Sequence, residues 1–350
     1  MRVKHIAHVE LFVENADEIA DAYTKTFGLS RIAEARPETG MVGRFSVALA
    51  SGEARVLITS ATSDGGPVAA YVRHHGDGVR DVAFEVDDVR AAHAELVARG
   101  ATTIEPPATW DGEGGACVRA TVGGFGDVVH SLIQREGGPT ALLPFYRAVT
   151  GPKAPQSAYK VIDHVAMCVE TGTLDATTQF YERVFGFVNS YEQYIETDIS
   201  GMNARVVEDE SGTVKFPMQE PLPNSRGPIA EFIEKNCGAG VYHIALQTDD
   251  ILPELRTLRD RGGHVLETPR AYYEALPQRV GTVAEDIDDL RALHVLVDRD
   301  QHGYLLQVFT RSLHARKTFF IEVIQRKAAR SFGNANVRAL FDAVEREAMS

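Results

Sequence analysis

The chain has 350 residues, of which 44% are apolar and 24% charged, and its formal net charge is −13. This length and composition are those of a globular protein with room for two domains. The acidic balance excludes nucleic acid and anionic membranes as expected partners, since both bind clustered Lys and Arg, and no apolar run approaches the roughly 18 residues of a membrane-spanning helix.

The N-terminus and the cysteines indicate a cytoplasmic protein. Residues 1–15 read directly into an alternating strand and contain no apolar signal-peptide core. Cys117, Cys168 and Cys237 are scattered without a CxxC pair. We therefore expect reduced, structural thiols with no metal or redox role.

The sequence consists of two similar halves. Three pairs of segments carry the repeat, namely 6–29 with 162–187, 76–101 with 238–263, and 124–135 with 302–311. The first pair aligns His8 with His164, and the second aligns Asp81 with His243. Such internal similarity indicates one structural unit used twice.

In chain order, short alternating or apolar runs predict strands, and helical spacing that ends in Gly predicts helices. The predicted strands are 8–13, 81–86, 164–169 and 243–248, and the predicted helices are 89–100 and 252–263. The order strand, helix, strands occurs four times, which predicts an α+β fold of four βαβββ modules paired within each half. Residues 151–160, with Pro and Lys, form the expected linker, so the predicted domains are 1–150 and 158–350.

Comparison of the halves isolates three candidate metal ligands, His164, His243 and Glu322. Each lies within an apolar, strand-like run, and successive members are 79 residues apart. The first half keeps His8 but has Asp81 opposite His243, and it offers no carboxylate in a strand like TFFIEVIQ. We therefore expect a structural first half and a catalytic second half.

The apolar neighbours of Glu322 make its carboxylate costly to bury without a cation, a hydrogen-bond network or water. Two imidazoles and one carboxylate form the facial triad of non-haem Fe(II) oxygenases, which leaves positions open for substrate and O₂. Taken singly, each His is better explained as a core residue, and Glu322 as a side chain on the solvent face. Together, the three predict a metal site. Zinc accepts the same ligands, although no HExxH helix is present.

The second half resembles the family of 4-hydroxyphenylpyruvate dioxygenases and 4-hydroxymandelate synthases, in the vicinal oxygen chelate superfamily. The resemblance covers nearly all of residues 158–348 and rests on IDHVAM, FYERVFGF, VKFPMQEPLPN, EFIEKNCGAGVYHIALQTDDI, GYLLQVFTR and TFFIEVIQRKAARSFGNANVRALFDAVEREA. The first half matches more loosely, and its GDGVRDVAFEVDDV and GGFGDVVHSLIQR are more similar to the mandelate synthase branch. The resemblance implies two open-barrel halves and a C-terminal lid helix.

The same resemblance implies a cofactor and a reaction. Fe(II) on His164, His243 and Glu322 would chelate a 2-oxo acid through its carboxylate and keto oxygen, with O₂ as the second substrate. Loss of CO₂ is then coupled to hydroxylation, because the pocket decides which carbon is oxidised. Attack on the ring gives homogentisate, and attack on the benzylic carbon gives a mandelate. The family also implies a homodimer or homotetramer.

Five further residues are expected around the substrate. Gln307 matches a family pocket glutamine, and Phe332 and Val337 belong to the lid, which would exclude water. Gln307 as an ordinary strand amide and Phe332 as a core residue remain open alternatives. Gln219 and Tyr242 replace other polar residues of the family and would restore substrate contacts from new positions.

Departures from the family pattern bear on the substrate and the product. Val337 is aliphatic where ring-hydroxylating members carry Phe, which favours the mandelate synthase type, whereas Pro217 keeps the ring-hydroxylating form. The family's usual polar residues are also replaced at Ala204, Gln219, Pro228 and Tyr242. Losing a buried hydrogen-bond partner costs about 1–3 kcal/mol, so the pocket is expected to suit 4-hydroxyphenylpyruvate, another arylpyruvate or an aliphatic 2-oxo acid.

Other functions of the same modules are alternatives to this dioxygenase. Extradiol cleavage of catechols uses two His and a carboxylate but no 2-oxo acid. A glyoxalase-like isomerase usually has a different ligand set. A metal-free binding protein would bind no stoichiometric iron.

Replacing Val337 by Phe should shift products from benzylic toward ring oxidation, because an added ring would wedge the substrate differently against the metal. Mass spectrometry of the products formed from 4-hydroxyphenylpyruvate measures the ratio. An unchanged ratio would discount Val337 as a determinant of product.

Overall fold

The computed structural model of the protein describes residues 1–112, 115–136, 143–149, 159–196, 201–333 and 335–336. Most of the expected linker, residues 151–158 of 151–160, lies outside this part of the chain. Among the described helices, none is long and apolar enough to cross a membrane.

The first half contains a set of strands and helices that ends before the expected linker. Its elements are β1 (Val3–Phe12), α1 (Ala16–Phe27), β2 (Ser30–Ala35), η1 (Pro37–Thr39), β3 (Arg44–Ser51), β4 (Ala54–Ala61), α2 (Gly66–His75), β5 (Gly78–Val86), α3 (Val89–Ala98), β6 (Thr103–Gly112), β7 (Gly115–Gly123), β8 (Val129–Arg135) and β9 (Arg147–Ala148).

The second half repeats this order with extra helices before its last strands. Its elements are β10 (Tyr159–Cys168), α4 (Leu174–Phe180), η2 (Tyr181–Phe185), β11 (Val188–Glu196), β12 (Gly201–Glu208), β13 (Lys215–Pro221), α5 (Pro228–Asn236), β14 (Gly240–Thr248), α6 (Ile251–Asp260), α7 (Arg270–Val280), α8 (Ile287–Ala292), β15 (Leu296–Arg299), β16 (Tyr304–Phe309) and β17 (Phe320–Lys327).

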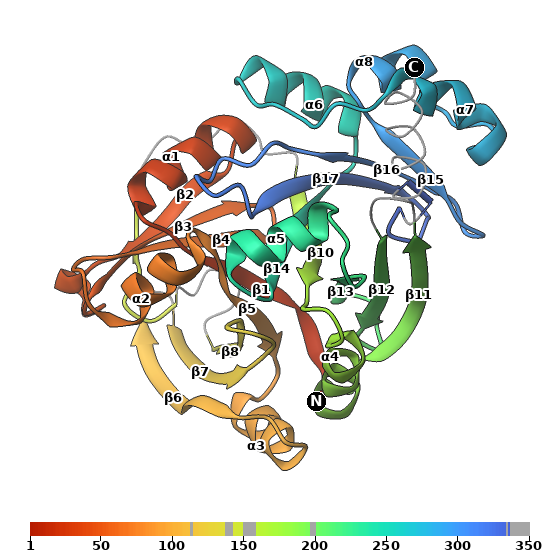
Figure 1. Cartoon of the computed structure of the whole chain (residues 1–350). Coiled ribbons are helices and arrows are strands. Elements are labelled where there is room, and N and C mark those ends of the chain that lie inside the picture. The colour runs from red at the N-terminus through yellow and green to blue at the C-terminus, as the bar shows by residue number, and fades with distance from the viewer. Residues whose placement is uncertain (113–114, 137–142, 150–158, 197–200, 334, 337–350) are drawn as a thin grey trace.

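Each half forms one curled sheet (Figure 1). The strand orders are β6-β7-β8-β5-β1-β4-β3-β2-β9 and β11-β12-β13-β10-β14-β17-β16-β15. Four βαβββ modules account for all strands of both sheets except the short edge strand β9, which confirms the predicted fold. The central strands have matching burial patterns, position by position, in β1 and β10 and again in β5 and β14. Nearly every residue of these strands is buried, as expected where both faces of a sheet are covered.

The sheet order corrects the third pair of the sequence repeat. β8 pairs in parallel with β5, just as β17 pairs in parallel with β14. The counterpart of 124–135 is therefore the strand that carries Glu322, not the GYLLQVFTR strand at 302–311. The similarity of SLIQR in β8 to EVIQR in β17 supports the corrected alignment.

The local sequence explains where the first helix of each half ends. In α1 the Asn15 side chain caps the start by accepting a hydrogen bond from the Glu18 backbone N–H. Gly28 then ends α1, and Gly186 ends the corresponding helical segment, with φ of 68° and 73°. Glycine adopts this left-handed conformation without a Cβ penalty.

The two halves are joined by a reciprocal pair of buried contacts. The Tyr23 hydroxyl lies 3.0 Å from His314 Nε2, and the Tyr181 hydroxyl lies 2.8 Å from His130 Nε2. Each tyrosine comes from the first helical segment of its own half, and each histidine comes from the other half. One hydrophobic cluster includes residues of both halves around these pairs.

Replacing Tyr181 by Phe should lower the free energy of unfolding by about 1–3 kcal/mol. His130 Nδ1 lies 2.9 Å from the Val82 carbonyl oxygen and donates to it, so Nε2 accepts from Tyr181 and would be left buried without a donor. Chemical denaturation measures the change. Tyr194→Phe is the control, since that side chain is exposed, and equal stability of the two variants would refute the importance of this contact.

Candidate metal centre

Three adjacent strands position the candidate ligands. β10 carries His164, β14 carries His243 and β17 carries Glu322, and these strands are neighbours in the order β10-β14-β17. Ala245 in β14 pairs with His164 on one side and with Glu322 on the other. His243 lies two residues before Ala245 and points to the same face, because side chains alternate along a strand. The register alone therefore brings the three side chains together.

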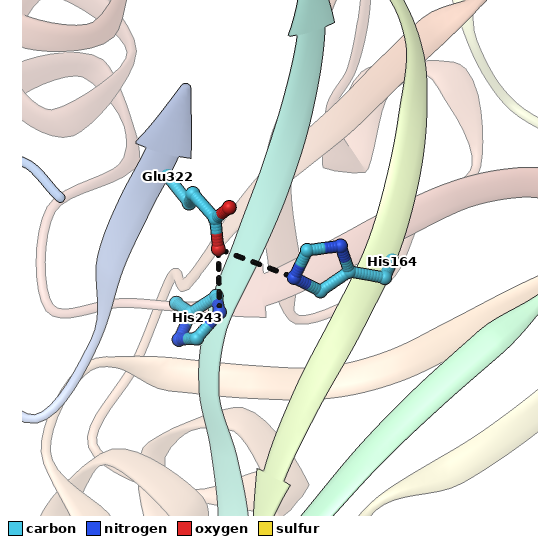
Figure 2. Close-up of side chains that lie close together, drawn as sticks. All are labelled: His164, His243 and Glu322. Atoms are coloured by element: carbon cyan, nitrogen blue, oxygen red, sulfur yellow. Dashed lines mark hydrogen bonds and ion pairs between the residues drawn. The ribbon is translucent and has the colours of Figure 1, made fainter. Parts of the chain in front are cut away.

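The three side chains converge on one point (Figure 2). Glu322 Oε2 lies 3.2 Å from His164 Nε2 and 3.0 Å from His243 Nε2. Their candidate ligand atoms all lie within 4.8 Å of one another, and all three residues are buried. This is the only such group of three or more His, Cys, Asp or Glu within the described ranges.

The charges and unpaired atoms of this cluster suit a bound cation. Burial disfavours ionisation of Glu322, but the two imidazoles outweigh burial and lower the pKa of its carboxyl to about 2. Burial lowers the pKa of His243. His243 Nδ1 and Glu322 Oε1 are buried without a hydrogen-bond partner. Two nitrogen donors and one carboxylate are the ligand set that binds a divalent transition metal and leaves positions open.

Asp163 binds the outer nitrogen of His164, and Arg326 binds Asp163; neither residue was predicted from the sequence to belong to the site. Asp163 Oδ1 lies 2.8 Å from His164 Nδ1. Arg326 donates to both carboxylate oxygens of Asp163, each at 2.6 Å. Burial disfavours the Asp163 carboxylate, but the Arg326 guanidinium outweighs burial and lowers the pKa of Asp163 well below its usual range. An ionised Asp163 holds the His164 proton on Nδ1, which leaves the Nε2 lone pair for a metal.

Arg326 also binds the segment that follows β17. Its guanidinium donates to the carbonyl oxygens of Ala329, at 3.2 Å, and Ser331, at 2.6 Å. It lies 5.4 Å from the centroid of the Phe332 ring. That ring in turn meets His164 edge-on, with centroids 5.5 Å apart. The structure thus places Phe332 beside the candidate ligands, and its predicted role in a lid over the substrate stays a prediction.

Gln307 lies on the same sheet face as Glu322. It pairs with Ile324 across β16 and β17, where Phe309 pairs with Glu322. The Gln307 side chain is buried, and its Oε1 has no hydrogen-bond partner. A Cβ at Gly333, whose φ is 73°, would clash with this amide, so the chain after Phe332 passes close over Gln307. Its role toward a substrate stays a prediction.

Tyr242 and Gln219 are placed less directly. The Tyr242 ring meets the Phe320 ring edge-on, with centroids 4.7 Å apart, and Phe320 stacks on His243 at 5.0 Å. Half-buried Gln219 pairs with Ala204 across β12 and β13, and with Cys168 across β10 and β13. Their predicted roles in substrate binding are not tested by these contacts.

Val337 and the rest of the predicted lid helix after it lie outside the described residues. The chain leading to them borders a cavity of about 800 Å³ whose lining includes Ser331, Phe332, Lys215 and Asp300. The predicted influence of Val337 on the product therefore stays a prediction from the sequence.

Comparison with known proteins gives consistent matches along the whole chain. Residues 5–127 and 161–308 match the family described as "Glyoxalase/Bleomycin resistance protein/Dioxygenase superfamily". The 4-hydroxyphenylpyruvate dioxygenase of Pyricularia oryzae is 35% identical over an alignment of 373 positions, which covers 97% of this chain and 89% of the relative. That of Dictyostelium discoideum is 34% identical, with 97% of each covered. Among solved structures, a triple mutant of 4-hydroxymandelate synthase from Streptomyces coelicolor matches with a TM-score of 0.89, 39% identity and 99% coverage of both chains.

Replacing Asp163 by Asn should lower metal affinity about 10- to 100-fold, because the neutral amide holds the His164 tautomer less firmly. Titration of chelator-treated protein with Fe(II) or Co(II) measures the affinity. The matched control is Asp175→Asn, which removes an exposed carboxylate that pairs with Arg205. Equal affinities of the two variants would show that Asp163 does not position His164.

Proposed function

The chain belongs to the Glyoxalase/Bleomycin resistance protein/Dioxygenase superfamily and, within it, to the 4-hydroxyphenylpyruvate dioxygenase family, and from this premise we propose that it is an Fe(II)-dependent dioxygenase of an arylpyruvate. The observation that carries the proposal is the convergence of two buried imidazoles and a buried carboxylate from three adjacent strands. Among the described residues, Glu322 forms ion pairs with His164 and His243 alone.

His164, His243 and Glu322 are proposed to hold the iron. Three protein ligands on one face leave adjacent positions for a chelating 2-oxo acid and O₂. Bound iron would supply the coordination sites for O₂ and would relay to it the electrons released by oxidation of the 2-oxo acid substrate. The protein's own contribution is to turn an Nε2 lone pair of each imidazole toward the metal. Asp163 does this for His164 by accepting a hydrogen bond from its Nδ1–H.

The surroundings of the triad favour an aromatic substrate. Phe309 and Phe320 pack against His243, with ring centroids at 5.6 and 5.0 Å, and Phe332 packs against His164. Aromatic walls bind a flat ring by edge and face contacts. These rings also limit the access of water, which protects a reactive site from side reactions.

Gln307 is proposed to fix the orientation of the substrate. Its Oε1 is a buried acceptor without a donor, which is costly unless a bound molecule provides one. The phenol hydroxyl of a 4-hydroxyphenylpyruvate is a donor of this kind. Gln219 and Tyr242 are proposed as further substrate contacts.

We favour benzylic hydroxylation over ring hydroxylation. One oxygen atom of O₂ would enter the new carboxylate, the other would enter the benzylic C–H bond, and CO₂ would leave, which gives a 4-hydroxymandelate. Val337 and the 39% identity to the mandelate synthase mutant support this choice. Homogentisate formation is the second candidate, since Pro217 and the 4-hydroxyphenylpyruvate dioxygenases at 35% identity support it.

Anaerobically purified protein loaded with Fe(II) should convert 4-hydroxyphenylpyruvate and O₂ to a 4-hydroxymandelate with release of CO₂. Mass spectrometry identifies the product. Homogentisate as the sole product would overturn the preference within the family. Turnover of catechols without any 2-oxo acid would overturn the proposed reaction itself.

His164→Ala, His243→Ala and Glu322→Ala should each lose bound iron and turnover while retaining the fold, because each removes one of three ligands. Metal analysis, activity and circular dichroism measure the three properties. His302→Ala, which removes an exposed imidazole, should behave like the unchanged protein. A triad variant that retains iron and activity would remove that residue from the ligand set.

A further inference from the structure

The first half contains a counterpart of the metal centre in which two of the three ligands have been replaced. Asp81 takes the place of His243, and His8 takes the place of His164. Phe84 pairs with Leu132 just as Leu246 pairs with Val323, which puts Ser131 at the position of Glu322. Asp81 accepts hydrogen bonds from the Ser131 backbone N–H and hydroxyl. One imidazole therefore remains where the second half has three candidate ligands.

A guanidinium provides the positive charge in this counterpart. Arg119 pairs with Ile133 across β7 and β8, just as Gln307 pairs with Ile324 across β16 and β17. Arg119 therefore occupies the position of Gln307. Its Nε donates to the Ser131 hydroxyl at 3.3 Å. In the first half, the Arg119 guanidinium thus supplies the positive charge that a bound metal ion would supply in the second half.

This counterpart opens into a cavity of about 370 Å³, within the size range of small-molecule sites. His8, Glu10, Arg44, Trp110, Arg119 and Tyr146 are among its lining residues. His8 is only 3% exposed, and its Nδ1 has no hydrogen-bond partner. A buried polar atom of this kind is costly when it is left without a partner.

The lining combines both signs of charge with aromatic rings. Glu10 accepts a 2.6 Å hydrogen bond from the Thr59 hydroxyl at one carboxylate oxygen. Arg44 makes no ion pair among the described residues, and its guanidinium carbon lies 5.9 Å from the centroid of the Phe12 ring. Trp110 and Tyr146 supply flat apolar surface. A ligand that matches these groups carries an ammonium, a carboxylate and an aromatic ring.

We propose that this cavity binds a small zwitterionic aromatic amino acid. Its ammonium group would lie near Glu10, its carboxylate near Arg44, and its ring against Trp110 and Tyr146. Charge-assisted hydrogen bonds of both signs fix the orientation of such a ligand. The site is separate from the metal centre and does not depend on the reaction proposed for it.

Fluorescence of Trp110 tests the proposal directly, because Trp110 is the one tryptophan of the chain. The full chain is titrated with L-phenylalanine, with 3-phenylpropionate, which lacks the ammonium, and with 2-phenylethylamine, which lacks the carboxylate. L-phenylalanine should change the fluorescence saturably and bind at least about tenfold more tightly than either analogue. No saturable change, or equally tight binding of an analogue, would overturn the proposal.

Two variants assign the charged contacts. Arg44→Gln should weaken binding of L-phenylalanine about tenfold and leave binding of 2-phenylethylamine unchanged. Glu10→Gln should weaken binding of both ammonium compounds. Arg36→Gln is the control, because Arg36 pairs with Glu34 on the surface. If Arg44→Gln and Arg36→Gln bind alike, the proposed orientation is wrong.

A variant of the metal centre distinguishes the two sites. Glu322→Gln should retain the fluorescence response to L-phenylalanine, because Glu322 belongs to the other sheet. Loss of the response in this variant, with the fold intact by circular dichroism, would assign the ligand to the metal centre and overturn the proposal.

Discussion

Burial of the Glu322 carboxylate beside the imidazoles of His164 and His243 constrains the structure around it. A buried carboxylate without positive charge nearby costs several kcal/mol, and Glu322 keeps one oxygen unpaired. The neighbouring groups are arranged accordingly. Asp163 holds the outer nitrogen of His164, and Arg326 neutralises Asp163 while it binds the carbonyl oxygens of the following segment. Asp163 and Arg326 therefore connect His164 to the segment that follows β17 through a series of ion pairs and hydrogen bonds.

The duplicated fold shows how one register serves two chemistries. Both halves place an imidazole, a residue of the next strand and a residue of the strand beyond it on the same inner face. In the second half Glu322 and Gln307 leave room for a cation. In the first half Ser131 and Arg119 occupy these two positions, and the guanidinium supplies the charge. Changes at a few strand positions separate a proposed catalytic centre from a proposed binding cavity, while the strand pairing at these positions is the same in both halves.

Much of this arrangement could be predicted from the sequence, because repeats and apolar periodicity report on strands and their faces. The repeat aligned His8 with His164, and the structure gives both residues the same pairing. The sequence repeat matched 124–135 with 302–311 wrongly, because short apolar strands have similar sequences. Only their pairing in the sheets identifies the strand of Glu322 as the counterpart. Asp163 and Arg326 were missed for a related reason. Asp163 and Arg326 lie 163 positions apart in the sequence, and only the register of the sheet shows that their side chains meet.

Anomalous diffraction at the iron edge, from crystals grown with Fe(II) and a 2-oxo acid, locates the metal relative to the triad. We expect one strong peak per chain at about 2 Å from His164 Nε2, His243 Nε2 and a Glu322 oxygen, and no peak at the counterpart in the first half. A peak bound by other residues, or no peak at the triad in iron-loaded crystals, would show that these three side chains do not hold the iron.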